Sequence, residues 1–183
     1  MKVIFLDVEG VLNTRETYER AYRLRGQTAM IDLELDSFRL EYLKTIIDET
    51  GAKIVLSSSF RYFFEKKDGK LLPTNFKGKK LYDNFKKFGI EIYDTTVPKM
   101  GNREEQIKEW LLNRDDIESF VIIDDDPSAF FELYQNLIIT GNAKRNYLSS
   151  FMKESTGLCK SHIPEIIDKL NKKEKVLSKH FWH

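Results

Sequence analysis

KVIFLDVEGV, residues 2–11, is the stretch of sequence that decides the fold. Its first half is a short apolar run with β-branched and aromatic residues, which is typical of a strand buried on both faces of a parallel sheet. The run ends at Asp7, and Glu9 and Gly10 follow at once. Gly10 permits a tight backbone path that brings both carboxylates towards a common ligand. The stretch therefore predicts a first strand with a polar site at its carboxyl end.

Further apolar runs end in polar residues and alternate with helical patterns along most of the chain. This alternation predicts an α/β fold, a three-layer α/β/α Rossmann-like domain with a mainly parallel five-stranded sheet. In such sheets the ligand site lies outside the carboxyl ends of the strands. The expected strands are 2–6, 53–56, 90–93, 120–123 and 136–139, and the expected helices are 36–49, 81–88, 103–112 and 128–134.

Two segments do not follow this alternation. Residues 13–35 carry arginines and tyrosines and are expected to form a loop or an amphipathic flap, and residues 60–80 read as a basic and aromatic insertion. Only about 45 residues separate Glu9 from the second strand, and one helix uses much of that length. We therefore expect a minimal cap or none, a single domain over residues 1–170, and a tail over 171–183.

The composition indicates a soluble globular protein. Of the 183 residues, 41% are hydrophobic and 32% are charged, which suffices for one sizeable core and a wet surface. The formal charge of +1 argues against a uniformly basic nucleic-acid binder. No run reaches the roughly 20 apolar residues that span a bilayer. A single cysteine, Cys159, favours a reducing compartment. We expect a cytoplasmic monomer without a membrane partner.

A second group of carboxylates, Asp124 to Asp126, ends another predicted strand. In a parallel sheet this group meets Asp7 at one edge, where two carboxylates about 4 Å apart repel by roughly 4 kcal/mol at an effective dielectric near 20. The arrangement calls for a cation, and hard oxygen ligands favour Mg²⁺, which in turn implies a phosphate. Asp126 precedes Pro127 and is expected to cap a helix instead.

The order of these pieces resembles the four motifs of the haloacid dehalogenase (HAD) superfamily, over Lys2 to about Phe130. The pieces are a lone aspartate after the first strand, serines after the second, a basic residue near a helix start, and a late aspartate cluster. A finer resemblance is to the small capless branch formed by the HAD domain of Swiss Army Knife RNA repair proteins. It rests on IVLSSSFR (54–61), REEQIKEWL (103–111), VIIDDD (121–126) and TGL (156–158).

The resemblance implies a phosphatase with Mg²⁺ as cofactor. Asp7 would attack phosphorus and become an aspartyl phosphate, and Glu9 would serve as general acid and then as general base. The backbone carbonyl of Glu9 would join Asp7 and Asp125 on the metal, with Asp124 as a ligand or as a group that orients one. Most phosphatases of the superfamily have Asp where Glu9 stands, but the enolase-phosphatase branch also reads Asp-x-Glu-Gly.

The resemblance also assigns the phosphate-binding residues. Ser57 would donate a hydrogen bond to a phosphoryl oxygen, with Ser58 as a second hydroxyl that could equally be a helix cap. The neutralising cation would be Arg103 or Lys99, with Lys108 as a further alternative.

An open site suits a phosphorylated substrate as large as a nucleic-acid end, although a small molecule also fits. Two other functions remain open at this point. One is a non-catalytic module that binds phosphate or nucleic acid, and the other is a phospho-receiver domain, in which the acidic pair would come first and the lone aspartate later. Nucleic acid would contact Arg61, Lys66, Lys67 and Lys70.

Overall fold

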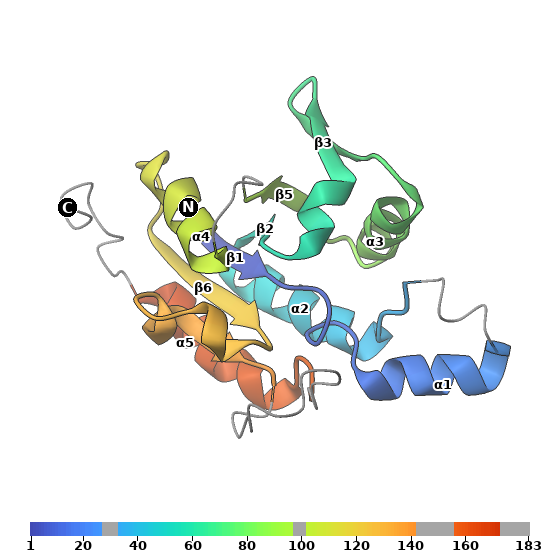
Figure 1. Ribbon diagram of the computed structural model, residues 1–183. Coiled ribbons are helices and arrows are strands. Elements are labelled where there is room, and N and C mark those ends of the chain that lie inside the picture. Colours follow the sequence, from blue (N-terminus) through green and yellow to red (C-terminus); the bar gives the residue numbers. More distant parts are fainter. Residues whose placement is uncertain (27–32, 97–101, 142–155, 173–183) are drawn as a thin grey trace.

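The computed structural model describes residues 1–26, 33–96, 102–141 and 156–172. A five-stranded sheet with the order β5-β2-β1-β6-β7 forms its centre, and all four neighbouring pairs are parallel. The predicted fold class is confirmed, and Figure 1 shows β1 in the middle of the molecule. The strands are β1 (Lys2–Leu6), β2 (Lys53–Leu56), β5 (Ile92–Thr95), β6 (Ser119–Asp124) and β7 (Leu137–Ile139).

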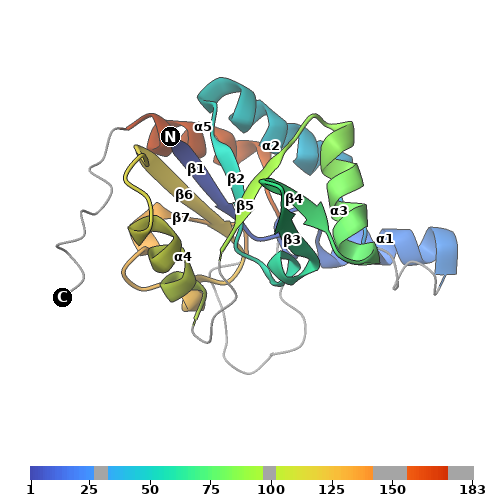
Figure 2. The ribbon, with the colours of Figure 1, turned by 90° about the horizontal axis from the view of Figure 1, so that it is seen from above.

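Helices cover both faces of this sheet (Figure 2). Ile4 and Leu6 of β1 belong to the core shared with α2 (Ser37–Thr50), α3 (Phe76–Lys87) and α5 (Ile163–Asn171). The alternate residues, Val3 and Phe5, face the opposite core beneath α4 (Arg103–Leu112), where the Phe5 ring meets Trp110 edge to face. β1 is therefore buried on both sides, as its continuous apolar run predicts.

One predicted helix is wrong. Residues 128–134 form no α-helix; two short 3₁₀ turns, η3 (Pro127–Ala129) and η4 (Tyr134–Asn136), stand there instead. The reason is the buried carboxylate of Glu104, which accepts hydrogen bonds from the backbone N–H groups of Phe131 and Leu133, at 3.0 and 2.6 Å. These N–H groups are thereby satisfied without helical hydrogen bonds.

Other element boundaries shift by a few residues. α3 begins five residues earlier than predicted, because the Asn75 side chain caps it by accepting a hydrogen bond from the N–H of Gly78 at 2.9 Å. β5 begins two residues later than predicted. α4 begins and ends where the sequence predicts. The expected cap at Asp126 is present, but it caps the 3₁₀ turn η3.

The two segments outside the predicted alternation are structured where they are described. Within 13–35 lies α1 (Arg15–Arg25), a helix that projects from the body in Figure 1. Within 60–80 lie a 3₁₀ turn, η2 (Ser59–Phe63), and an antiparallel hairpin of β3 (Phe64–Lys67) and β4 (Lys70–Pro73). No helix in the described part of the chain has both the length and the apolar character needed to cross a bilayer.

Candidate active site at the carboxyl edge of the sheet

Backbone hydrogen bonds extend the sheet one residue beyond its strands and so place the polar residues in a row. Each of these residues donates its N–H to a carbonyl of the neighbouring strand, as in a continued parallel ladder. Four polar side chains therefore follow one another across the sheet edge at fixed spacing. The bonds are Thr96 to Leu56 (2.9 Å), Ser57 to Leu6 (3.1 Å), Asp7 to Ile123 (3.0 Å) and Thr140 to Asp124 (3.0 Å).

Three carboxylates meet at this edge. Asp7 follows β1, Asp124 ends β6, and Asp125 is the next residue. All three are buried, and one oxygen from each lies within 4.8 Å of the others. The register that pairs Leu6 with Ile123 makes Asp7 and Asp124 the next neighbours across the sheet. Parallel pairing thus produces the meeting of carboxylates that the sequence predicts.

Arg103 reaches this acidic cluster from the amino-terminal end of α4. The Asn102 side chain caps that helix by accepting a hydrogen bond from the N–H of Glu105 at 2.9 Å, which fixes where Arg103 begins the first turn. An Arg103 guanidinium nitrogen lies 3.3 Å from Asp7 Oδ2 and also forms an ion pair with Asp124. Burial lowers the pKa of Arg103, but the carboxylates of Asp7 and Asp124 outweigh burial and raise it.

Burial and the neighbouring charges together set the protonation of Asp7. Burial, together with the neighbouring carboxylates of Asp124 and Asp125, raises the pKa of Asp7 to about 7, although Arg103 acts to lower it. A carboxyl group in this position gains from any additional positive charge. Carboxylate oxygens without imidazole or thiolate ligands are the donor set that suits Mg²⁺. The residues present therefore fit a hard divalent cation.

Two glycines allow Asp125 to lie where it does. Gly10 has a φ of +81°, and a Cβ at this position would lie 2.4 Å from Asp125 Cγ. A Cβ on Gly141 would lie 2.4 Å from the carbonyl oxygen of Asp125. Gly10 therefore meets two needs, because the backbone requires the left-handed region and the carboxylate requires the space of a side chain.

The two serines differ in what their hydroxyl groups do. Ser57 is fully buried, and its Oγ has no hydrogen-bond partner in the described part of the chain. Ser58 Oγ accepts a hydrogen bond from the N–H of Phe60 at 3.1 Å and caps η2. A buried hydroxyl without a partner is unusual in a folded protein. Ser57 thus has a donor ready for a ligand beside Asp7, whereas Ser58 has the capping role weighed from the sequence.

The remaining predicted residues are placed less closely. Glu9 is exposed, and its carboxylate lies outside the cluster formed by Asp7 and its two neighbours. Lys108 forms ion pairs with Glu105 (3.0 Å) and Glu132 (2.6 Å) on α4 and the loop opposite it. Lys99 lies outside the described residues. Of Arg103 and Lys108, the two alternatives within the described residues, Arg103 is the one that lies beside Asp7.

Sequence reasoning missed two residues beside Glu9. Asn13 is buried, accepts a hydrogen bond from the N–H of Gly10 at 3.1 Å and donates one to the Tyr18 hydroxyl at 2.9 Å. A sequence signal existed, because Thr14 and Thr17 have the spacing of a capping box and form one. That signal would have placed Tyr18 on the first turn of a helix that follows the loop after β1.

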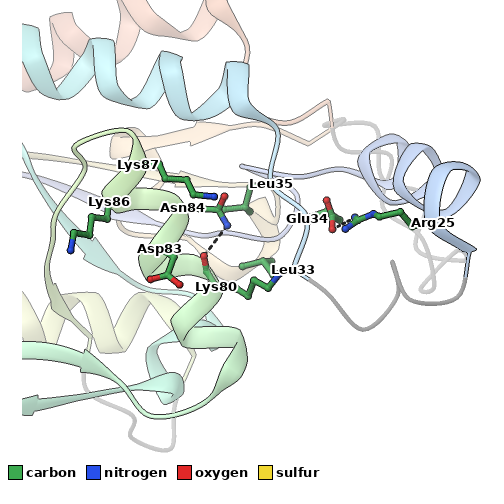
Figure 3. A pocket seen from close by; sticks show the side chains of 9 residues that line it. All are labelled: Arg25, Leu33, Glu34, Leu35, Lys80, Asp83, Asn84, Lys86 and Lys87. Atoms are coloured by element: carbon green, nitrogen blue, oxygen red, sulfur yellow. Dashed lines mark hydrogen bonds and ion pairs between the residues drawn. The ribbon is translucent and has the colours of Figure 1, made fainter.

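A cavity of about 630 Å³ lies elsewhere, between the segment 33–35 and α3 (Figure 3). Lysines of α3 and the pair Arg25 and Glu34 line it, and none of its lining residues belongs to the acidic cluster. The acidic cluster at the sheet edge is therefore separate from this cavity.

Comparison with known proteins gives one match. The family described as the HAD domain in Swiss Army Knife RNA repair proteins matches residues 3–145, which is well over half of the chain. The matched range contains the acidic cluster, Ser57 and Arg103. No curated protein and no solved structure gives a significant match.

Proposed function

Because the chain belongs to the family of HAD domains in Swiss Army Knife RNA repair proteins, we propose that it is a magnesium-dependent phosphatase that hydrolyses a phosphate monoester through an aspartyl phosphate on Asp7. The observation that carries the proposal is the position of Asp7. It lies between the buried Ser57 hydroxyl on one neighbouring strand and Asp124 on the other, with Arg103 at 3.3 Å. A candidate nucleophile, a hydroxyl donor, further carboxylates and a guanidinium group thus share one edge of the sheet.

The reaction proceeds in two displacements. In the first, an Asp7 carboxylate oxygen forms a bond to phosphorus while the bond to the leaving oxygen breaks, and Glu9 donates the proton that the leaving oxygen takes up. In the second, a water oxygen attacks phosphorus, Glu9 accepts the proton of that water, and the bond between Asp7 and phosphorus breaks. Asp7 and Glu9 then return to their initial states.

Ser57 and Arg103 bind the phosphoryl group. The Ser57 hydroxyl donates to a phosphoryl oxygen, and this interaction satisfies a group that is otherwise buried without a partner. Arg103, held by Asp7 and Asp124, presents its remaining N–H donors to the same group and stabilises its charge. Asp7, Asp124 and Asp125 would hold Mg²⁺, which would supply positive charge to the carboxylates and to the phosphoryl group.

The test is phosphate release by the purified chain with Mg²⁺ and p-nitrophenyl phosphate. Asp7→Asn should lower the rate by at least about 1,000-fold, because the amide cannot form the phosphoenzyme. A matched control is Asp94→Asn, which changes a buried aspartate of β5 that binds Trp110 and Arg114 away from the cluster. The control should keep activity within about 3-fold, in line with substitutions remote from the chemistry.

Glu9→Gln separates the two displacements. The general base of the second step is lost, so labelled phosphate should accumulate on Asp7 and should be released by hydroxylamine, as expected for an acyl phosphate. Phosphate release that persists in Asp7→Asn would overturn the nucleophile assignment. Binding of Mg²⁺ and inorganic phosphate by wild-type protein that releases no phosphate from any ester would instead identify the non-catalytic phosphate-binding module.

The substrate we propose is the phosphorylated end of a nucleic-acid strand. The hairpin of β3 and β4 follows the Ser57–Ser58 loop through η2, and its Lys66, Lys67 and Lys70 are exposed. Tyr62 is 55% exposed, and the Arg61 guanidinium lies 4.6 Å from the centre of its ring. Exposed aromatic and basic groups together suit the stacking and phosphate contacts of a single strand.

Charge removal on the hairpin tests this substrate. Changing Lys66, Lys67 and Lys70 to Gln should raise the KM for a 3′-phosphorylated oligonucleotide, reduce its salt dependence, and leave p-nitrophenyl phosphate unaffected. The control changes three lysines away from the hairpin to Gln. Lys44 lies on α2, and Lys160 and Lys172 lie before and after α5. Equal loss in both triple variants would contradict a specific role of the hairpin and would favour a small-molecule substrate.

A further inference from the structure

The backbone after β1 turns back so that Asn13 lies beside Glu9. The N–H of Leu12 donates to the carbonyl of Val8 at 2.9 Å, and Glu9 and Asn13 form an isolated parallel bridge. The Asn13 side chain is 1% exposed, so its amide must find hydrogen-bond partners within the protein. Those partners are the N–H of Gly10 and the hydroxyl of Tyr18.

These two bonds exclude Asn13 as the acceptor of the Tyr18 hydrogen. The N–H of Gly10 can only donate, so the Asn13 oxygen faces it and the Asn13 amide nitrogen faces Tyr18. The Tyr18 oxygen therefore accepts from Asn13 at 2.9 Å, and its own hydrogen points elsewhere. Burial and the charges of Glu9 and Glu34 raise the pKa of Tyr18 to about 12, so this hydrogen is present at neutral pH.

Contacts at both ends of α1 hold the helix, and with it Tyr18, in place. Thr17, next to Tyr18, donates its hydroxyl to the buried Asp36 carboxylate at 2.7 Å. At the other end of the helix Arg25 forms an ion pair with Glu34, which Figure 3 shows. A helix fixed at two points can present a phenol at a defined position, which a loose flap could not.

We propose that Tyr18 is a positioning residue, whose hydroxyl donates a hydrogen bond to the Glu9 carboxyl group and holds it on the leaving-group side of Asp7. This inference rests on the proposed phosphatase function and deepens it. Glu9 is exposed, and an exposed glutamate samples several rotamers. A donor fixed by Asn13 selects the rotamer from which Glu9 can protonate the leaving oxygen. Asn13 acts one step further back, because it directs the Tyr18 hydrogen away from itself.

The test compares two leaving groups. p-Nitrophenolate leaves without help from an acid, whereas the alkoxide of β-glycerophosphate needs a proton, and kcat/KM reports the transfer to Asp7 in both cases. Tyr18→Phe should lower kcat/KM for β-glycerophosphate by about 10- to 100-fold, part of the usual contribution of general acid catalysis, and for p-nitrophenyl phosphate by less than about 3-fold. Loss by the same factor on both substrates would overturn the proposal.

Three further variants make the assignment specific. Tyr22→Phe, one turn along α1 and 49% exposed, is the matched control and should leave both substrates unchanged. Asn13→Asp should reproduce Tyr18→Phe, because a carboxylate accepts the Tyr18 hydrogen and withdraws it from Glu9. In a Glu9→Gln background, Tyr18→Phe should have no further effect. A full additional loss in that background would show that Tyr18 acts independently of Glu9 and would reject the positioning role.

Binding separates failure of this proposal from failure of the proposed function. Calorimetric Mg²⁺ affinity should stay within about 2-fold of wild type in Tyr18→Phe, because this change removes no charge and lies outside the acidic cluster. A wild-type protein that neither binds Mg²⁺ nor releases phosphate would refute the phosphatase itself. A wild-type protein that does both, with unchanged leaving-group preference in Tyr18→Phe, would refute only the role of Tyr18.

Discussion

Two buried aspartates of this protein, each beside an arginine, have pKa values that shift in opposite directions. Asp7 is 5% exposed and Asp36 is 3% exposed, and each has an arginine within ion-pair distance. Burial raises the pKa of Asp7 to about 7, with Asp124 and Asp125 adding to the effect. Burial also acts to raise the pKa of Asp36, but hydrogen bonds from Thr17, Arg39 and Arg20 outweigh it and lower the pKa.

The two aspartates differ in their neighbours. Asp36 accepts hydrogen bonds from Thr17 Oγ1 at 2.7 Å and Arg39 Nε at 2.9 Å, and Arg39 in turn donates to the carbonyls of Thr156 and Leu158. This network joins α1, α2 and the segment before α5. Asp7 instead faces further carboxylates. A satisfied buried charge fixes the fold, whereas a crowded one gains from a ligand that supplies positive charge.

The largest effect on stability should come from breaking the satisfied network. Asp36→Ala leaves the buried Arg39 guanidinium without its carboxylate, and breaking a buried pair in this way costs about 3 to 5 kcal/mol. Urea unfolding followed by circular dichroism measures the loss. The control is Arg20→Gln, which removes a partner that is 54% exposed and should cost no more than about 1 kcal/mol. Equal losses would show that burial of Arg39 is unimportant.

Mg²⁺ should distinguish the two aspartates next. A cation that binds the folded state alone stabilises it by about 2.7 kcal/mol at 100 times its dissociation constant, which is visible as a rise in the melting temperature. Wild type and Arg20→Gln should show this rise, whereas Asp7→Asn and Asp124→Asn should lose most of it. Removal of the cation with a chelator should reverse it. An undiminished rise in Asp7→Asn would place the metal elsewhere.

Neutralising the crowded aspartate should stabilise the metal-free protein. Asp7→Asn removes a carboxylate that burial and Asp124 disfavour, so the free energy of unfolding at pH 7 should rise by about 1 to 3 kcal/mol. The same substitution should abolish the proposed turnover, an opposition between stability and function that is common at functional sites. Denaturant unfolding in the presence of a chelator measures the gain. A loss of stability instead would mean that the ion pair with Arg103 outweighs the repulsion.

The sequence predicts the surroundings of Asp7 far better than those of Asp36. Asp7, Ser57 and the aspartates after β6 each follow an apolar run, and parallel pairing brings such positions to one edge without further information. Arg103 was one of several alternative cations, because helix periodicity locates its helix but not the direction of its side chain. In the structure the cap at Asn102 fixes the first turn of α4, and this turn brings Arg103 to Asp7.

Long-range hydrogen bonds explain what the sequence does not predict. Arg39 donates hydrogen bonds to carbonyls 117 and 119 residues further along the chain, and no local sequence pattern predicts such contacts. Glu104 likewise takes the N–H groups that the predicted helix over 128–134 would have used. Tyr18 belongs to a helix whose start signal was present at Thr14, but its proximity to Glu9 depends on the tertiary anchor at Asp36.

The smallest effect should come from acid, and its sign separates the two aspartates. Because the pKa of Asp36 is lower in the folded than in the unfolded chain, its contribution is complete above the unfolded value near 3.9 and is lost as the pH falls through the folded value. The stability difference between wild type and Asp36→Asn should therefore be constant from pH 5 upward and should shrink below about pH 4.

For Asp7, whose pKa is raised to about 7, the metal-free folded state holds the proton more tightly than the unfolded chain does. The difference between wild type and Asp7→Asn should therefore change between about pH 4 and pH 7 instead. Unfolding curves at several pH values in a chelator test both statements. If the two differences changed over the same pH range, burial alone would control both carboxyl groups, and the contrast between their neighbours would have no energetic meaning.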